Sequence, residues 1–186
     1  MNIIIRSSEK WEHLVIQLFE YSKLEADQIE PQKEPFHLTD LAQDIHAKYQ
    51  ILAAQKNIKL QLHTEKELPI VFADLALVER AIQNLIDNAL KFTPENGRVD
   101  IYLDADNNGV EVKICDSGPG IPKEQQPLIF ERYRKTEPSG NSKGAGLGLA
   151  IVKKILEIHN ATIQVSSLPN QGATFWFRLP VYQMNT

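Results

Sequence analysis

The chain has 186 residues, of which 42% are hydrophobic and 24% charged, a composition typical of one soluble globular domain with a short appendage. Its 24 acidic and 20 basic side chains give a formal net charge of −4, which argues against a nucleic-acid-binding protein. The single cysteine, Cys115, excludes an internal disulfide framework and a multi-cysteine zinc site. No apolar run approaches the roughly 20 residues of a membrane helix, so we expect no membrane contact from this chain.

The first predicted element is an amphipathic helix near the N-terminus. Its apolar side chains recur every three or four residues, as on one helix face, but they extend over only about two heptads. Pro31 and Pro35 end the pattern, because proline lacks a backbone donor and disfavours helix at the residue before it. We therefore expect a helical arm over 1–33 and a domain over 34–182, with the apolar stripe packed on a partner or on the domain's own core. The stripe consists of Trp11, Leu14, Leu18 and Tyr21.

The rest of the chain mixes helical and strand patterns. Apolar residues with helical period predict helices over 38–52, 75–92 and 149–159, and Asp74 is a candidate N-cap for the second of these. Alternating residues predict strands, two of which are joined as a hairpin by an Asn-Asn-Gly turn at 107–109. The predicted strands are 57–63, 69–73, 98–104, 110–115, 163–166 and 173–179. We expect an α+β fold, a two-layer α/β sandwich in which the helices cover one face of a mixed, mostly antiparallel sheet.

The predicted helix over 75–92 carries polar residues within an otherwise apolar segment. Asn84, Asn88 and Lys91 lie three or four residues apart and therefore share one helix face. One interpretation is a solvated polar face opposite the core. The other is a site for a hard cation and phosphate, since an amide oxygen suits Mg²⁺ and a lysine supplies a point charge.

Two glycine-rich segments lie in a stretch from 116 to 148 that has no regular period and exceeds the length of an ordinary loop. The segment 116–120 (DSGPG) puts an acceptor, Asp116, directly after a strand, although alone it is also typical of a simple strand-to-loop turn. The segment 144–149 (GAGLGL) leads into a helix, whose first N–H groups form an anion site. It matches neither the dinucleotide-binding fingerprint nor the P-loop.

In this order and spacing, the motifs resemble the N, G1, F and G2 boxes of the catalytic ATP-binding domain of sensor histidine kinases. The resemblance covers about residues 36–180 and implies a Bergerat-type fold with a lid over 121–143. Residues 21–26 (YSKLEA) resemble the end of the second helix in that family's dimerisation and phosphoacceptor hairpin. The boxes are 84–93 (NLIDNALKFT), 116–120 (DSGPG), 130–133 (FERY) and 144–149 (GAGLGL), and 172–180 (GATFWFRLP) resembles the closing strand.

The resemblance implies ATP and Mg²⁺ as cofactors and assigns roles to individual residues. Asn88 is expected to hold Mg²⁺ and Lys91 to contact the phosphates, while Phe92 packs on the nucleotide. Asp116 is expected to accept the adenine amino group, helped by Thr174 through water. The other expected ATP-binding residues are Asn84, Gly118, Gly120, Ile121, Gly144, Gly146, Leu147, Gly148 and Leu149. The expected catalytic residues are Asn84, Lys91 and Arg132, with Arg134 as the alternative arginine for the γ-phosphate.

Asn84 distinguishes between branches of the wider superfamily. In gyrases, mismatch-repair proteins and heat-shock chaperones, a glutamate at this position activates water, whereas an amide cannot act as a general base. Bound ATP is therefore expected to hydrolyse slowly and to wait for a protein nucleophile.

The family's phosphoacceptor histidine, which precedes an acidic residue, has no match in this chain. The five histidines precede Leu14, Leu38, Ala47, Thr64 and Asn160. We expect His13 and His159 to be structural or surface residues, and the chain to be a fragment that donates the γ-phosphate to a histidine on its own dimerisation domain elsewhere. A response regulator receiver domain in the cytoplasm would then receive the signal. The alternatives are a free-standing serine kinase with a related domain and a nucleotide-sensing module that transfers nothing.

Overall fold

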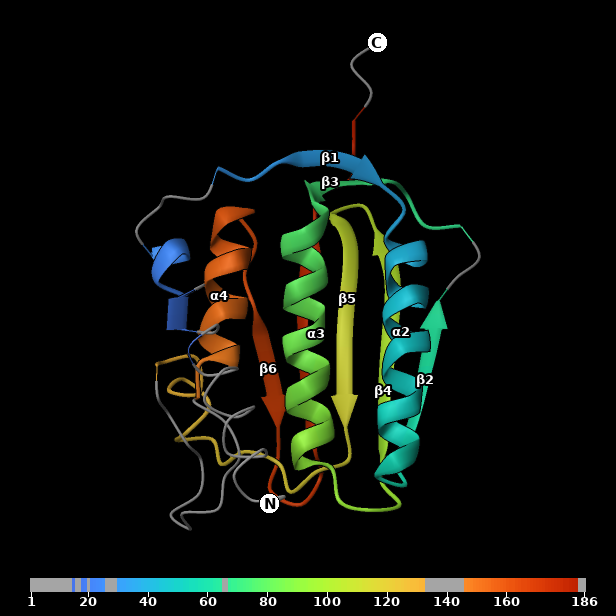
Figure 1. Ribbon diagram of the computed structural model, residues 1–186, viewed down its shortest axis with the longest axis vertical. Helices are drawn as coiled ribbons and strands as arrows, with labels where there is room; N and C mark the ends of the chain where they lie inside the picture. The colour runs from blue at the N-terminus through green and yellow to red at the C-terminus, as the bar shows by residue number, and fades with distance from the viewer. Residues whose placement is uncertain are drawn as a thin grey trace, which may run out of the picture.

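The computed structural model describes residues 15, 18, 19, 21–25, 30–64, 67–132 and 146–183. In this part of the chain, α2 (Leu38–Gln55), α3 (Leu75–Phe92) and α4 (Gly148–Ile158) lie side by side on one face of a five-stranded sheet (Figure 1). Helices on one face and a sheet behind them make a two-layer α+β sandwich. The predicted fold class is confirmed.

The five-stranded sheet has the order β2-β4-β5-β7-β6. Its β2 and β4 strands run parallel, and every other neighbouring pair is antiparallel, as expected for a mixed, mostly antiparallel sheet. Gly109 begins the second strand of the predicted hairpin with φ +138°, a conformation that favours glycine. The strands are β2 (Lys59–Thr64), β4 (Arg98–Asp106), β5 (Gly109–Asp116), β6 (Gln164–Ser167) and β7 (Ala173–Leu179).

A second, two-stranded sheet crosses the upper end of the helices in Figure 1 and consists of β1 (Lys33–Phe36) and β3 (Val71–Asp74). The sequence predicts no strand at β1, because Pro35 is typical of the boundary after a helix. Proline is compatible with a strand that has a neighbour on one side only, because its missing N–H can face away from the ladder. Pro35 pairs with Phe72 in this way.

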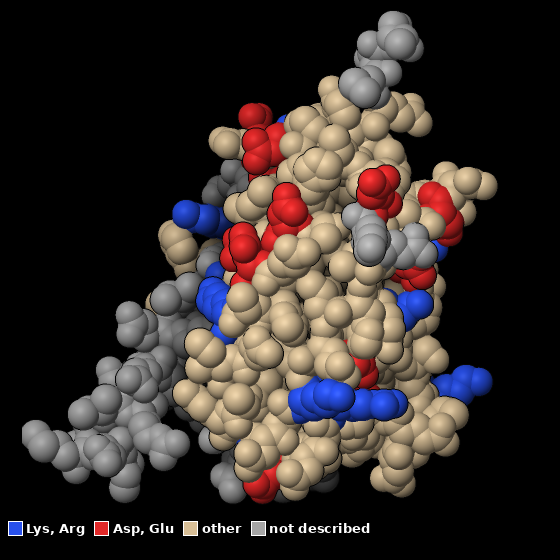
Figure 2. Space-filling view, turned by 90° about the vertical axis from the view of Figure 1, so that its right-hand side faces the viewer, with Lys and Arg blue, Asp and Glu red and all other residues tan. Residues whose placement is uncertain are grey.

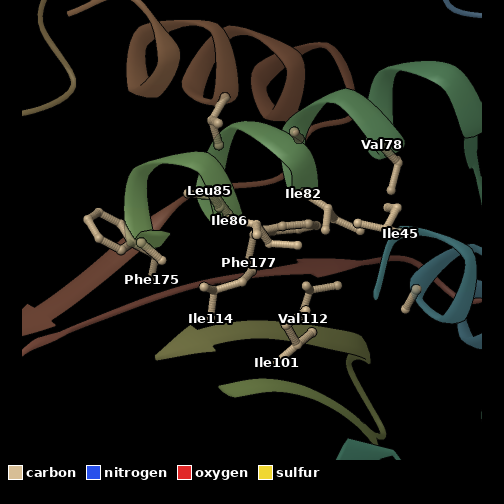
Figure 3. Close-up of a cluster of buried hydrophobic side chains, with 14 of the residues drawn as sticks. Ile45, Val78, Ile82, Leu85, Ile86, Ile101, Val112, Ile114, Phe175 and Phe177 are labelled. Carbon is tan, nitrogen blue, oxygen red and sulfur yellow. The ribbon is translucent and has the colours of Figure 1, made fainter. Parts of the chain in front are cut away.

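The core lies between α3 and the sheet (Figure 3). Alternate residues of β5 and β7 point toward the helices, and these residues are at most 5% exposed. The predicted core positions of α2 are buried except Leu52, which is 43% exposed, while Ala53 is 1% exposed. Because the helix repeats about every 3.6 residues, Ala53 rather than Leu52 lies on the same buried face of α2 as Tyr49. The residues around the contact in Figure 3 are Ile45, Val78, Ile82, Leu85, Ile86, Ile101, Val112, Ile114, Phe175 and Phe177.

Two predicted helix ends have the expected chemistry. The Asp74 side chain caps α3 by accepting a hydrogen bond from the Leu77 N–H at 3.0 Å. After α4, Asn160 adopts a left-handed φ of +54°, a conformation that asparagine tolerates at the end of a helix. His159, directly before it, is buried, in agreement with its expected structural role.

Residues 21–25 of the arm are helical, and Leu24 among them is 3% exposed and belongs to the domain's core cluster. This contact shows one apolar arm side chain packed on the domain rather than on a partner. Leu18, a residue of the predicted apolar stripe, is 48% exposed. Trp11 and Leu14 lie outside the described residues, and the boundary near residue 33 stays a prediction. On the face that carries α2 and β2, acidic and basic side chains are interspersed (Figure 2).

Candidate nucleotide site

The predicted motifs meet at one end of the sandwich, the lower end in Figure 1. The end of α3, the end of β5, the start of β7 and the start of α4 all lie there. This meeting follows from the topology: β5 is antiparallel to β7, and α3 packs directly on α4. The motifs 84–93, 116–120 and 172–180 are thereby brought together.

Asn84 is buried between α3 and α4. It is 8% exposed, and its Nδ2 donates a hydrogen bond to the Arg80 carbonyl at 2.9 Å. A Cβ on Gly148 would lie 3.1 Å from Asn84 Oδ1, so the missing side chain of Gly148 lets the start of α4 approach this amide. A solvated polar face is therefore wrong for Asn84, whose side chain faces the first turn of α4.

The remaining polar residues of this helix face lie closer to its C-terminus. Asn88 is half-buried, one turn after Asn84. Lys91 is exposed, and its Nζ lies 4.6 Å from the centre of the Phe92 ring. An amide, a cation and an aromatic ring therefore follow one another along the end of α3.

Asp116 lies at the end of β5 with part of its hydrogen-bonding capacity in use. Its Oδ1 accepts from the Gly118 N–H at 2.8 Å and from the Ala173 N–H at 3.2 Å. Burial raises the pKa of the carboxyl group, while the two backbone donors lower it. Among the described residues, no donor reaches Oδ2. This oxygen remains available to accept a hydrogen bond from a ligand.

The loop after Asp116 packs closely on its surroundings. A Cβ on Gly118 would lie 2.8 Å from Asp116 Oδ1 and 3.1 Å from the Phe92 carbonyl oxygen, so the loop touches the end of α3. At Gly120, with φ +73°, a Cβ would lie 2.0 Å from the Leu168 carbonyl oxygen. The glycines hold the loop between α3 and the β6–β7 turn, which is a packing role in addition to their predicted role in ATP binding.

Two side chains that support this loop, those of Ser167 and Gln126, are not predicted from the sequence. Ser167 Oγ accepts from the Ile121 N–H at 2.8 Å and donates to the Gly172 carbonyl at 2.6 Å. Gln126 Nε2 donates to the carbonyls of Ile121 and Ser167 at 3.0 and 2.8 Å. Single serine and glutamine residues carry no sequence signal, whereas Gly172, in the closing motif, could have been found through its turn context.

Thr174 does not lie with Asp116. In the register of β5 and β7 it faces Cys115, and its Oγ1 donates to Cys115 Sγ at 3.4 Å. Because neighbouring strand residues point to opposite faces, Asp116 and Thr174 lie on different sides of the sheet. The expected assistance of Asp116 by Thr174 is therefore wrong, and the β7 group that contacts Asp116 is the Ala173 N–H.

The start of α4 has the backbone geometry that the predicted anion site requires. Gly146 has φ +71°, and Leu147, 1% exposed, accepts the first helical hydrogen bond from the Ile151 N–H at 2.9 Å. No side chain caps this helix, so its first N–H groups stay available to an anion. Leu149 is half-buried, and Gly144 lies outside the described residues.

The described part of the lid ends at Arg132, which contacts the arm. Its guanidinium forms an ion pair with Glu25 and lies 4.7 Å from the centre of the Tyr21 ring. Arg134 and residues 133–143 lie outside the described residues. Among the described residues, no three His, Cys, Asp or Glu side chains gather to hold a metal. A metal bound here would therefore need ligands such as amide oxygens and phosphates.

Comparison with known proteins identifies the family. The model of the family "Histidine kinase-, DNA gyrase B-, and HSP90-like ATPase" matches residues 73–183. The adaptive-response sensory kinase SasA of Synechocystis sp. (strain PCC 6803) is 37% identical over 173 residues, which are 92% of this chain and 45% of that protein. The chain thus spans about half the length of this curated relative.

Two solved structures have the same architecture. Full-length ShkA in complex with AMPPNP is 29% identical with a TM-score of 0.86, over 99% of this chain and 39% of that one. Histidine kinase ThkA in complex with the response regulator TrrA is 28% identical with a TM-score of 0.79, over 97% and 50%. No helix among the described residues is long and apolar enough to cross a membrane. The chain belongs to the family of histidine kinase-, DNA gyrase B- and HSP90-like ATPases and is a catalytic ATP-binding domain of the histidine-kinase type.

Proposed function

We propose that this domain binds Mg-ATP and donates the γ-phosphate to a histidine on a dimerisation domain outside this chain. The observation that carries the proposal is the convergence at one end of the sandwich of Asp116, the uncapped start of α4 and the polar face of α3. A base acceptor, an anion site and a hard-ligand amide are the three groups that a metal-bound nucleoside triphosphate requires.

Asp116 is proposed to recognise the adenine. Its Oδ1 is held by two backbone donors, which fixes the carboxylate plane, and Oδ2 accepts from the exocyclic amino group. Phe92 packs on the base or sugar. The N–H groups at the start of α4, from Gly146 to Leu149, receive phosphate oxygens, and the helix dipole favours their negative charge.

Asn88 and Lys91 are proposed to serve the phosphate chain. Mg²⁺ keeps several water ligands and takes only one or two protein oxygens in nucleotide sites, so the half-buried Asn88 amide fits it without an acidic cluster. The bound ion would neutralise charge on the phosphates. Lys91 adds a second positive charge at the exposed end of α3.

Asn84 supports phosphoryl donation rather than hydrolysis. It occupies a buried position against Gly148, and its Nδ2 is already bonded to the Arg80 carbonyl. An amide does not take a proton from water. ATP bound here is therefore expected to persist until a histidine nucleophile approaches its γ-phosphate.

The names of the similar proteins support the proposed partners. SasA is described as a sensory kinase, ShkA was crystallised with AMPPNP and ThkA with a response regulator. We propose the same order of transfer for the protein that contains this chain, from ATP to its own histidine and then to a receiver domain, with this domain in the cytoplasm.

Calorimetric titration of ATP, with and without Mg²⁺, tests the nucleotide assignment. Asn88→Ala is expected to abolish the Mg²⁺-dependent gain in affinity and to leave the unfolding midpoint unchanged. Asn108→Ala, in the exposed hairpin turn at the other end of the sheet, is the matched control. An Asn88→Ala variant with the full metal-dependent gain would disprove the Mg²⁺ assignment.

Transfer of labelled phosphate tests the reaction itself. The chain is mixed with ATP and a dimerisation domain of the same family, and the expected product is an acid-labile, base-stable phosphohistidine on that domain. Acid-stable phosphoserine would indicate a serine kinase instead. Tight ATP binding without transfer to the domain of the same full-length protein would indicate a nucleotide-sensing module.

A further inference from the structure

A cavity of about 760 Å³ lies at the end of the sandwich opposite to the nucleotide site. Its walls come from β1, from the turn after α4 and from the facing ends of β5 and β7. In Figure 1 these segments meet at the top, whereas the proposed nucleotide residues lie at the bottom. None of the residues assigned to nucleotide binding lines this cavity. It is therefore a separate candidate site.

Most charges at the cavity are already compensated. Arg178 Nη2 lies 3.0 Å from Glu111 Oε2 and 3.1 Å from Asp106 Oδ2. Glu111 also pairs with Lys113 at 3.0 Å. The half-buried Lys33 is different, because no described carboxylate lies within ion-pairing distance of its ammonium group. The uncompensated charge in this cavity is positive.

Asp74, opposite Lys33 in the register of β1 and β3, uses its carboxylate to accept the Leu77 and Gln32 N–H groups. His159 adds no charge beside Lys33. Both ring nitrogens of His159 are bonded, to the Asp74 N–H at 3.0 Å and to the Ile155 carbonyl at 2.8 Å. His159 therefore presents neither a free acceptor nor a charge to Lys33. An incoming anion is the partner that this lysine lacks.

Two aromatic residues line the same cavity. Trp176 is half-buried on β7, and Phe72 is 38% exposed with its ring 5.6 Å from that of Tyr182. Thr162 and Gln164 add side-chain hydrogen-bonding groups from the segment between α4 and β7. Flat apolar surfaces beside a few polar groups are typical of small-molecule sites, whose volumes run from about 300 to 1,000 Å³.

We propose that this cavity binds a small organic anion with an aromatic body. Its carboxylate pairs with Lys33, and its ring packs against Trp176 and Phe72. Such a ligand enters without breaking the Arg178–Glu111 pair, and it adds the one charge that the cavity lacks. This inference is independent of the proposed kinase function, because it uses no residue of the nucleotide site.

Titration of the ¹⁵N-labelled chain with 2-naphthoate tests the proposal. The indole N–H of Trp176, identified by its loss in Trp176→Phe, is expected to shift saturably with a dissociation constant on the order of 1 mM. The neutral isostere 2-naphthamide is expected to bind about three- to fivefold more weakly, since a half-exposed ion pair contributes only a modest gain. Absence of a saturable Trp176 shift, or equal binding of the amide, would overturn the proposal.

Two further experiments test where the anion binds. Lys33→Gln is expected to remove the preference for naphthoate over naphthamide, whereas Lys59→Gln, an exposed strand lysine outside the cavity, keeps it. Saturating Mg-AMPPNP is expected to leave the naphthoate titration of Trp176 unchanged. If the nucleotide displaced naphthoate, or if Lys33→Gln kept the full preference, the anion would bind elsewhere and the proposal would be wrong.

Discussion

The two ends of the α3–α4 helix pair use their buried polar groups in opposite ways. At the upper end, the Asp74 N–H donates to His159 Nε2 at 3.0 Å, and His159 Nδ1 donates to the Ile155 carbonyl at 2.8 Å. The Asp74 carboxylate accepts from the backbone N–H groups of Leu77 and Gln32 at 3.0 and 2.7 Å. Each of these polar groups has a partner within the protein.

At the lower end, several polar groups have hydrogen-bonding positions that no described residue fills. Asp116 uses one carboxylate oxygen, α4 begins without a side-chain cap, and the buried Thr93 hydroxyl has no partner among the described residues. A buried polar group without a partner costs free energy, so a fold tolerates it where a ligand supplies the missing bond. The comparison separates the Asp74–His159 network, whose polar groups are satisfied within the domain, from the groups around Asp116 that are proposed to bind nucleotide.

The largest expected effect is on ligand binding through Asp116. Asp116→Asn keeps an acceptor for the Gly118 and Ala173 N–H groups but turns an NH₂ group toward the adenine amino donor. Loss of a hydrogen bond to a charged group, together with this mismatch, is expected to weaken ATP binding about 10- to 100-fold, measured by calorimetry. The unfolding midpoint should change little. Undiminished affinity in a folded Asp116→Asn protein would contradict the assignment of this end as the binding end.

The next effect concerns stability at the opposite end. His159→Ala removes a buried ring and leaves the Asp74 N–H without its acceptor, which is expected to cost about 2–4 kcal/mol in the free energy of unfolding. ATP affinity of the folded variant should stay unchanged. Urea unfolding measures the loss, with His37→Ala, at an exposed position, as the control expected within about 0.5 kcal/mol of the parent. A His159→Ala protein as stable as that control would show that the network contributes nothing.

The same contrast explains how far the sequence predicts this molecule. The helices and the sheet follow from apolar periodicity, and the binding residues on α3 and in the 116–120 loop follow from polar residues that interrupt it. Each of these signals is local. Strand β1 was not predicted, because its pairing with β3 joins segments about 40 residues apart and because the strand includes a proline.

Residues that support the site through contacts with a distant segment were not predicted for the same reason. Ser167, at the end of β6, bonds the Ile121 backbone 46 residues away along the chain, and Gln126 bonds the Ser167 carbonyl 41 residues away. No local pattern records these contacts. Thr174 shows the converse error: the motif suggested a role, but the one-residue alternation of β7 turns its side chain to the far face. Sequence identifies which residues are unusual, and the strand register decides which of them meet.

A smaller effect is expected on the free energy of unfolding when the pH is lowered. Burial lowers the pKa of His159 below the 6.5 of the free side chain, so below pH 6.5 the unfolded chain takes up a proton that the folded one does not. Stability is therefore fully present above pH 6.5 and falls as pH decreases toward the folded pKa, by up to about 1.4 kcal/mol per pH unit. The raised pKa of Asp116 acts with the opposite sign.

Urea unfolding between pH 7 and pH 5 distinguishes the two ends. The parent is expected to lose about 1–2 kcal/mol over this interval, and His159→Ala is expected to lose less, because the titrating group is absent. Asp116→Asn lacks the opposite contribution of Asp116 and should lose at least as much as the parent. Parallel declines of the parent and His159→Ala would assign the acid sensitivity to other groups.

The smallest effect is expected where the lid meets the arm. The Arg132–Glu25 pair is about half exposed on both sides, so it contributes only about 0.2–1 kcal/mol. If Arg132 serves the γ-phosphate, Glu25→Gln releases it and raises ATP affinity by up to about fivefold in low salt, while ADP affinity stays constant because ADP lacks that phosphate. Glu124→Gln, an exposed lid residue, is the matched control, and about 0.5 M NaCl should erase the gain. An equal gain for ATP and ADP would instead mean that Glu25 acts through the general field of the site, and that Arg132 has no particular γ-phosphate role.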